Sequence, residues 1–219
     1  MLYDLSQPVF HNVPQWPKFQ PTSLTVPHLA AIEPANVERI DLTTHTGTHI
    51  DAPFHFFPEL EPVDRLPLNH FHAPCVAVDL RYKAAGNGIV AEDFKALREK
   101  DANGAVVLLK TGWAEKRALS TEFLTAWPYL TGTGARYLLS LNVHGVGIEG
   151  LSIGGFNDPE KETASHKALL SAKKLIVEDI RVPEALLDGK IRHFAAFPIL
   201  IAGASGAWAR AIAWDEGDL

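Results

Sequence analysis

Residues 43–56, TTHTGTHIDAPFHF, bring three histidines and an aspartate into one short segment. His45, His49, Asp51 and His55 all carry odd numbers, so in an extended chain their side chains would share one face. Imidazole and carboxylate groups together are ligands that suit zinc, manganese or iron. We therefore predict that this segment binds a metal ion.

The metal segment cannot work as a regular helix or as a flat strand. Gly47 and Pro53 oppose a helix, and the glutamate of helical zinc motifs is missing. In a flat strand each residue advances ~3.3 Å, which would put His45 and His49 about 13 Å apart. That separation is too long for two ligands whose bonds to one ion measure about 2.0–2.1 Å. A bend at Gly47 would return His45 to the site, and Pro53 would turn the chain again so that His55 faces it. We predict a bent metal loop.

The elements beyond residue 75 show a mixture of strand and helix patterns. Apolar runs predict strands at 76–80, 105–110, 146–148, 174–180, 198–202 and 207–214. Helical patterns cover 91–100, 134–141, where Thr133 is the expected N-cap, and 161–173. Because the order is mixed, we expect an α/β fold with a mixed sheet and flanking helices. The first 75 residues are rich in proline and lack helix signals, so this N-terminal part should consist of loops and short strands.

The composition of the 219 residues fits one globular domain and excludes several functions. A net charge of −6 provides no basic field, so we expect no nucleic-acid partner. The apolar stretch 194–214 is interrupted by proline and glycine and alternates in its second half, which predicts two strands rather than a membrane span. Residues 1–10 lack the pattern of a secretory signal. Cys75 is the only cysteine, which is compatible with a reducing compartment, and we expect a cytoplasmic protein.

The motif HTGTHIDAPFHF resembles the signature of the metal-dependent cyclase-like hydrolases, a family that includes bacterial kynurenine formamidase and isatin hydrolase. Other segments also look like parts of that family: YDLSQPV near the start, QWP at 15–17, VVLLKTGW at 106–113, SHKALLSAKKLIVEDI at 165–180 and PILIAGASGAWARAIA at 198–213. The resemblance covers most of the chain. It implies that residues 1–219 form a single swivelling β/β/α domain that assembles as a homodimer or homotetramer.

The resemblance also implies roles for individual residues. Two divalent ions per subunit, zinc or manganese, would be held by His45, His49, Asp51, His166 and Glu178. Asp51 would bridge the two ions, and His55 would be the catalytic acid and base. Taken without the resemblance, His166 lies in a helical pattern where a surface or capping histidine is equally expected. Glu178 would pass for a solvent-facing residue at the end of a strand, unless that strand is central.

The implied chemistry is hydrolysis of a carbon–nitrogen amide bond. Two ions would lower the pKa of a bound water from 15.7 toward ~7, and the resulting hydroxide would attack the carbonyl. His55 would deliver a proton to the leaving nitrogen. The best match is an arylformamidase that converts N-formylkynurenine to kynurenine and formate in tryptophan catabolism. Trp16, Phe56 and Phe57 are candidates to line a pocket for an aromatic amide substrate.

Other functions remain open at this level. The same site in an isatin-hydrolase-like or lactonase-like relative would open a ring. A non-haem iron oxygenase could use His49, Asp51 and a distant histidine, although two histidines of the cluster would then lack a role. A non-catalytic metal-binding protein is a further alternative, because Glu149 and the long glycine-rich stretch 151–163 depart from the family pattern.

Overall fold

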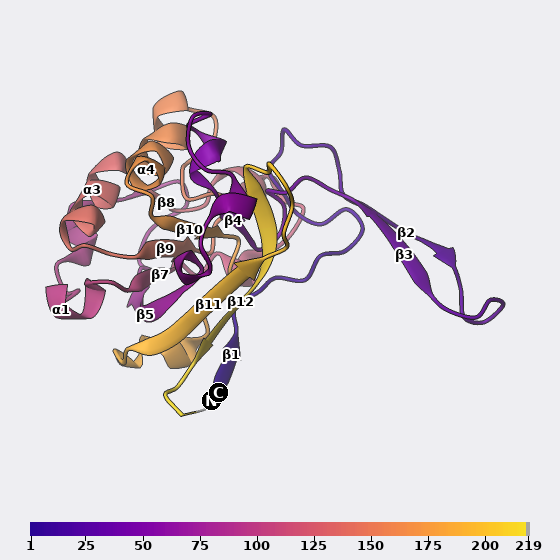
Figure 1. Cartoon of the computed structure of the whole chain (residues 1–219). Coiled ribbons are helices and arrows are strands. Elements are labelled where there is room, and N and C mark those ends of the chain that lie inside the picture. The colour runs from indigo at the N-terminus through magenta and orange to yellow at the C-terminus, as the bar shows by residue number, and fades with distance from the viewer. Residues whose placement is uncertain (218–219) are drawn as a thin grey trace.

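The computed structural model describes residues 1–217, and a mixed sheet of eight strands runs through it (Figure 1). Along the sheet the strands follow the order β1 (Leu2–Asp4), β12 (Gly206–Trp214), β11 (Arg192–Pro198), β5 (His72–Asp79), β7 (Val106–Lys110), β9 (Gly145–Ile148), β10 (Leu175–Glu178) and β4 (His49–Asp51). The pairs β5–β7, β7–β9 and β9–β10 are parallel, and the others are antiparallel. Strand β12 also pairs with β4, so the sheet closes on itself like a barrel.

The closed sheet has a hydrophobic cluster on each face. Strand β7 shows why, because its side chains alternate between the two faces. Val106 and Leu108 belong to the cluster that includes Ile50, whereas Val107 and Leu109 belong to the other cluster. All five residues of β7 are buried, as expected for a central strand with parallel neighbours. The α/β fold with a mixed sheet is therefore confirmed.

Helices cover the second of these clusters. The two longer ones are α3 (Gly132–Ser140) and α4 (Pro159–Ser171), which lie on one side of the sheet (Figure 1). The Thr131 side chain caps α3, and the Asp158 side chain accepts hydrogen bonds from two amides of the first turn of α4. Two short helices are α1 (Glu99–Ala102) and α2 (Thr121–Thr125). Within residues 1–217, six 3₁₀ turns lie at Pro53–His55, Val63–Arg65, Leu68–His70, Ala91–Phe94, Ala114–Lys116 and Glu184–Asp188.

Two small sheets complete the fold. Strands β6 (Gly88–Ile89) and β8 (Tyr129–Leu130) form a short parallel pair. Strands β2 (Ser23–His28) and β3 (Val37–Asp41) form an antiparallel arm that projects away from the body of the molecule (Figure 1). All five residues of β3 are exposed to solvent. The prediction of loops and short strands before residue 75 is confirmed.

Three sequence predictions about elements need correction. The expected strand at 198–202 is wrong, because β11 ends at Pro198 and the chain then turns, with Ile199 and Leu200 exposed and Gly203 at φ +70°. The expected helix at 91–100 is broken into a 3₁₀ turn and α1. Within 91–100 only Phe94 is fully buried in the core and Leu97 packs partly against it, and short helices depend on such packing. The N-cap of α3 is Thr131 rather than Thr133.

The predicted helices at 134–141 and 161–173 are confirmed within a few residues as α3 and α4. The apolar stretch 194–214 forms most of β11 and β12, which pair as an antiparallel hairpin. Among residues 1–217, no helix is both long enough and apolar enough to cross a membrane.

Candidate metal centre

The histidine segment bends at Gly47, as the sequence predicts. Gly47 has φ +73°, in the left-handed region that favours glycine, and a Cβ there would lie 2.9 Å from Val9. After the bend, β4 enters the sheet between β10 and β12, and its three residues are buried. A 3₁₀ turn from Pro53 to His55 then returns the chain toward the site. The bent loop is confirmed.

The sheet register brings a distant carboxylate to this loop. In the antiparallel pair of β10 and β4, Glu178 lies opposite His49. The distance from Glu178 Oε2 to His49 Nε2 is 3.2 Å. Helix α4 supplies His166, whose Nε2 lies 3.1 Å from Glu178 Oε1 and 3.6 Å from Asp51 Oδ2. Glu178 is therefore a buried residue of the site and not a solvent-facing strand end.

Five donors form two groups that share Asp51. The first group is His45, His49 and Asp51, and the second is Asp51, His166 and Glu178; within each, the donor atoms lie within 4.8 Å of one another. Asp51 Oδ1 lies 2.9 Å from His45 Nδ1 and 3.5 Å from His49 Nε2. The residues expected to hold metal are thus brought together.

Backbone and side-chain contacts orient the three imidazoles. The Nδ1–H of His49 donates to the carbonyl of Gly47 at 2.8 Å, and that of His166 donates to the carbonyl of Glu162 at 2.7 Å. His45 Nε2 contacts Ser205 Oγ at 2.9 Å. Each ring is thereby fixed through one nitrogen, and its other nitrogen faces the carboxylates. This is the arrangement in which a histidine ligates a metal while a second contact sets its orientation.

The buried polar atoms fit a cation. Asp51 Oδ2 and His49 Nε2 are buried and have no hydrogen-bond partner within residues 1–217. Such atoms are costly in a protein interior unless something pairs with them. Three imidazoles and two carboxylates are a donor set that suits zinc, manganese or iron. The residues present therefore fit a divalent metal ion.

Attraction between the imidazoles and the carboxylates stabilises this cluster when no cation is bound, and it shifts their pKa values. Burial disfavours the charged form of His49, but the nearby carboxylates of Asp51 and Glu178 outweigh it and raise the pKa of His49 to about 10. Burial and the charge of Asp51 would raise the pKa of Glu178, yet the close imidazoles of His166 and His49 lower it to about 2. The pKa of Asp51 is likewise held well below its ordinary value, because neighbouring histidines outweigh its burial.

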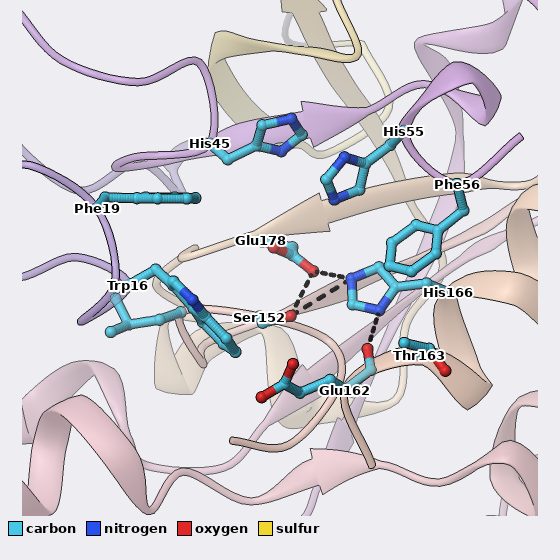
Figure 2. Close-up of a pocket in the computed structure, with 11 residues that line it drawn as sticks. Trp16, Phe19, His45, His55, Phe56, Ser152, Glu162, Thr163, His166 and Glu178 are labelled. Atoms are coloured by element: carbon cyan, nitrogen blue, oxygen red, sulfur yellow. Dashed lines mark hydrogen bonds and ion pairs between the residues drawn. The ribbon is translucent and has the colours of Figure 1, made fainter. Parts of the chain in front are cut away.

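A cavity of about 310 Å³ opens beside the donors (Figure 2). Trp16, Phe19 and Phe56 provide aromatic walls, and His45, His166 and Glu178 face it from the cluster. Other lining residues are His55, Leu151, Ser152, Glu162 and Thr163.

His55 lies in this cavity without belonging to either donor group. Its ring stacks on that of His45, with 4.1 Å between centroids. The loss of water around the ring, together with the neighbouring His45 and His166, lowers the pKa of His55 to about 4. Phe56 stacks on His166 at 4.7 Å, so it supports a donor as well as lining the cavity.

The structure does not bring every candidate to the cavity. Phe57 lies two residues beyond the end of the 3₁₀ turn at His55, and it packs against the core cluster between the sheet and the helices instead of lining the cavity. Sequence reasoning missed Ser152 and Glu162. Ser152 Oγ donates to Glu178 Oε1 at 3.2 Å, and the amide of Ile153 donates to the same oxygen at 2.6 Å. The glycine-rich composition of 151–163 was the available signal, since small residues let this loop approach the site.

The unusual Glu149 has a structural role. Its carboxylate is fully buried and accepts hydrogen bonds from the amides of Thr111, Gly112 and Val182 at 2.7–3.0 Å. Lys110 Nζ lies 3.3 Å from it. Glu149 therefore ties the ends of β7 and β9 to the segment after β10, and none of these contacts involves a metal donor.

The comparisons with known proteins agree with this geometry. A family model described as putative cyclase matches residues 3–154, more than half of the chain, and the chain therefore belongs to that family. A kynurenine formamidase from Geobacillus thermodenitrificans is 32% identical over 214 residues, which cover 95% of this chain and 94% of the relative.

Solved structures share the fold. A protein from Bacillus stearothermophilus described as a predicted metal-dependent hydrolase is 27% identical, with a TM-score of 0.78 and coverage of 99% of this chain and 98% of that one. Isatin hydrolase A from Ralstonia solanacearum has a TM-score of 0.86 at 24% identity, with coverage of 99% and 92%. The resemblance seen in the sequence is confirmed.

Proposed function

We propose that this protein is a metal-dependent hydrolase that cleaves carbon–nitrogen amide bonds, with arylformamidase activity on N-formylkynurenine-like substrates. One observation carries the proposal: five candidate metal donors, two of them with buried atoms that make no hydrogen bond, converge beside a cavity with aromatic walls. The full-length similarity to a kynurenine formamidase supports the substrate class.

We propose that the cluster holds two ions, zinc or manganese, with Asp51 shared between them. The two donor groups that meet at Asp51 support that number. When bound, such ions polarise a carbonyl oxygen and lower the pKa of water toward neutrality. Asp51 and Glu178 provide the negative charge that balances them.

His55 then transfers a proton from the attacking water to the leaving nitrogen. With a pKa of about 4, its imidazole is neutral at pH 7 and can accept a proton from the attacking water. It returns that proton to the amide nitrogen as the carbon–nitrogen bond breaks, because an amine leaves far more readily than its anion. Water and the formamide become formate and an arylamine, and no side chain is consumed. Stacking on His45 holds the ring in place.

The cavity walls bind and orient the substrate. Trp16, Phe19 and Phe56 are large apolar surfaces suited to a planar aromatic ring. A ring held between them excludes water from the donors, which strengthens the electrostatic interactions at the reacting carbonyl.

A ring-opening hydrolase related to isatin hydrolase is the second candidate. The shared fold and the aromatic cavity favour it, since a planar bicyclic amide would meet the same walls. An iron oxygenase is less well supported, because all five donors and His55 already have a place in the hydrolase scheme. A protein that binds metal without catalysis would keep its properties in a His55→Ala variant.

The experiment measures metal content and activity together. Elemental analysis of the purified protein identifies the ion, and the metal-loaded protein is then assayed with N-formylkynurenine, formanilide and isatin. Faster hydrolysis of the formamides supports the arylformamidase, whereas preference for isatin supports the second candidate. Protein that retains its ions yet leaves every formamide and cyclic amide intact contradicts the proposal. Oxygen uptake with Fe(II), followed at an electrode, would indicate the oxygenase.

We also propose that the protein assembles as a homodimer or larger oligomer through the arm of β2 and β3. An isolated two-stranded hairpin is marginally stable in water, and this arm leaves Val26, Leu29, Ile32, Val37 and Ile40 exposed. The arm is acidic overall. A groove of about 650 Å³ on the body contains Arg181 beside apolar side chains, while its other arginine, Arg210, pairs with Asp4. The positive charge of Arg181 suits an acidic arm, so a second copy is the partner that we propose. The cytoplasm remains our proposed location, consistent with the free, buried Cys75.

A further inference from the structure

A pair of opposite charges includes one residue of the cavity lining, Glu162, and one residue beside it, Lys18. Glu162 comes from the first turn of α4 and lines the cavity. Lys18 comes from the same N-terminal loop as Trp16, and its Nζ lies 3.4 Å from Glu162 Oε1. In Figure 2, the Glu162 carboxylate extends beneath Trp16, on the opposite side of the cavity from His45 and His55. No step of the proposed hydrolysis uses either charge.

Glu162 links the metal site to this outer region. Its backbone carbonyl accepts the hydrogen bond from His166 Nδ1, and its side chain accepts one from the amide of Asn157 at 2.8 Å. The carboxylate is therefore held in position while 24% of the side chain stays exposed. Glu162 precedes His166 by four residues, a helical rise of about 6 Å. That rise is comparable with the span of one aromatic ring and its substituent.

Lys18 is placed by aromatic rings and remains accessible. Its Nζ lies 5.9 Å from the centroid of Trp16 and 5.6 Å from that of Phe156. The side chain is 57% exposed, and its ion pair with Glu162 is long. Exposed pairs of this kind contribute little stability, so ligand charges can replace the contact at small cost.

We propose that Glu162 and Lys18 are specificity residues that bind the zwitterionic tail of the substrate, Glu162 its ammonium group and Lys18 its carboxylate. This inference rests on the proposed function. The cavity then has three successive regions: the metal donors and His55 at the amide, the aromatic walls at the ring, and the charge pair at an α-amino acid group on a short chain. A site of this kind favours aryl formamides that carry an amino acid over uncharged rings such as isatin.

The competing explanation is a structural latch. The pair joins the Trp16 loop to α4, and its loss could loosen the cavity wall for every substrate. A latch would alter catalysis for charged and uncharged substrates alike. A tail-binding pair would alter the preference between charged and uncharged substrates. The decisive measurement is therefore the ratio of kcat/KM for the charged substrate to kcat/KM for the uncharged one.

The test compares N-formyl-L-kynurenine with N-formyl-2-aminoacetophenone, which keeps the aryl ketone and lacks the amino acid. In Glu162→Gln and Lys18→Met, we expect the ratio of kcat/KM for the charged over the uncharged formamide to fall about tenfold or more, as expected for loss of a charge-assisted contact. Glu160→Gln is the matched control, because Glu160 lies in the same helical turn but outside this cavity, and its ratio should stay at the wild-type value. An unchanged ratio in both cavity variants overturns the inference.

A binding measurement separates this inference from the proposed function. Calorimetry with the products L-kynurenine and 2-aminoacetophenone requires no turnover. We expect the wild type to bind kynurenine more tightly and each cavity variant to lose that preference. If the metal-loaded wild type hydrolyses neither formamide, the proposed function fails, and the binding preference alone decides the inference. If the wild type binds the two products equally tightly, the inference that Glu162 and Lys18 bind the substrate tail is overturned.

Discussion

Gly206 lies directly against the ring of His45: a Cβ on Gly206 would be 2.5 Å from His45 Cε1 and 2.7 Å from the carbonyl oxygen of Ile50. Strand β12 therefore passes beside the metal loop at a distance that only glycine permits. Gly206 also lies opposite Asp51 in the pairing of β12 with β4, so the register of the sheet and the position of a donor depend on the same residue.

Gly206→Ala should displace His45 and weaken metal binding. The methyl group meets backbone as well as a side chain, so we expect a loss of stability of about 1–3 kcal/mol and reduced metal content. Elemental analysis and thermal unfolding measure the two effects. Gly134→Ala is the control, because its Cβ would lie 2.6 Å from the carbonyl oxygen of Ile89 and 2.8 Å from Leu130, and neither of these residues is a donor or adjoins one in the chain. Equal metal content in both variants would show that the close approach at Gly206 does not matter.

The shared carboxylate predicts different metal losses for two substitutions. Asp51→Asn weakens both donor groups, whereas His166→Ala removes a donor from one. We expect the first variant to lose all bound metal and the second to lose one ion of two. The ratio of metal to protein after dialysis measures this. Equal losses from the two variants would contradict a bridging role for Asp51.

His55 should affect the rate and leave the metal in place. Because it belongs to neither donor group, His55→Ala should keep its ions, while kcat falls about 10²- to 10⁴-fold through the loss of proton transfer. Its lowered pKa keeps the wild-type ring neutral above about pH 5, so acid inactivation through His55 is expected only below that pH. A pH–rate profile and metal analysis check both expectations. Full activity in the variant would assign the proton transfer elsewhere.

Metal binding should release protons. The pKa of His49 is raised to about 10, so this ring holds a proton at pH 7 without a cation, and the pKa of His166 is shifted in the same direction. An imidazole ligand must be neutral, so binding displaces the His49 proton, and affinity rises with pH by about tenfold per unit for each proton released. Calorimetric titration with Zn²⁺ in buffers of different ionisation enthalpy counts them. A heat independent of the buffer would mean that the donors are already neutral.

The sequence predicted the part of the site that is local in the chain. The bend at Gly47 and the shared face of His49 and Asp51 follow from backbone geometry within one segment. His166 and Glu178 could not be found this way, because a helix packed beside β10 and the register of β10 against β4 bring them in. Only the family resemblance pointed to them.

The roles of individual surface charges were the hardest feature to predict from the sequence. Glu162 in a helix and Lys18 in a loop have no spacing that distinguishes them from ordinary solvent-facing charges. Only the folded chain places Glu162 in the cavity lining and Lys18 Nζ 3.4 Å from its carboxylate. The mispredicted strand at 198–202 has a similar cause. Its residues are as apolar as those of a core strand, yet Ile199 and Leu200 are exposed beside the groove that we assign to a partner subunit.

The arm provides a test of assembly. If its exposed apolar side chains are buried against a second copy, Ile32→Glu combined with Val37→Glu should place charges in the interface and shift the protein toward the monomer. Light scattering after size-exclusion chromatography gives the mass of wild type and variant. Leu119→Glu is the control, because Leu119 is also exposed but lies outside the arm, and this variant should keep the wild-type mass. A monomeric wild type, or a variant of unchanged mass, would contradict assembly through the arm. Because Phe19 and His45 flank the two ends of the arm and both line the cavity, loss of the contact should also raise KM for the formamide.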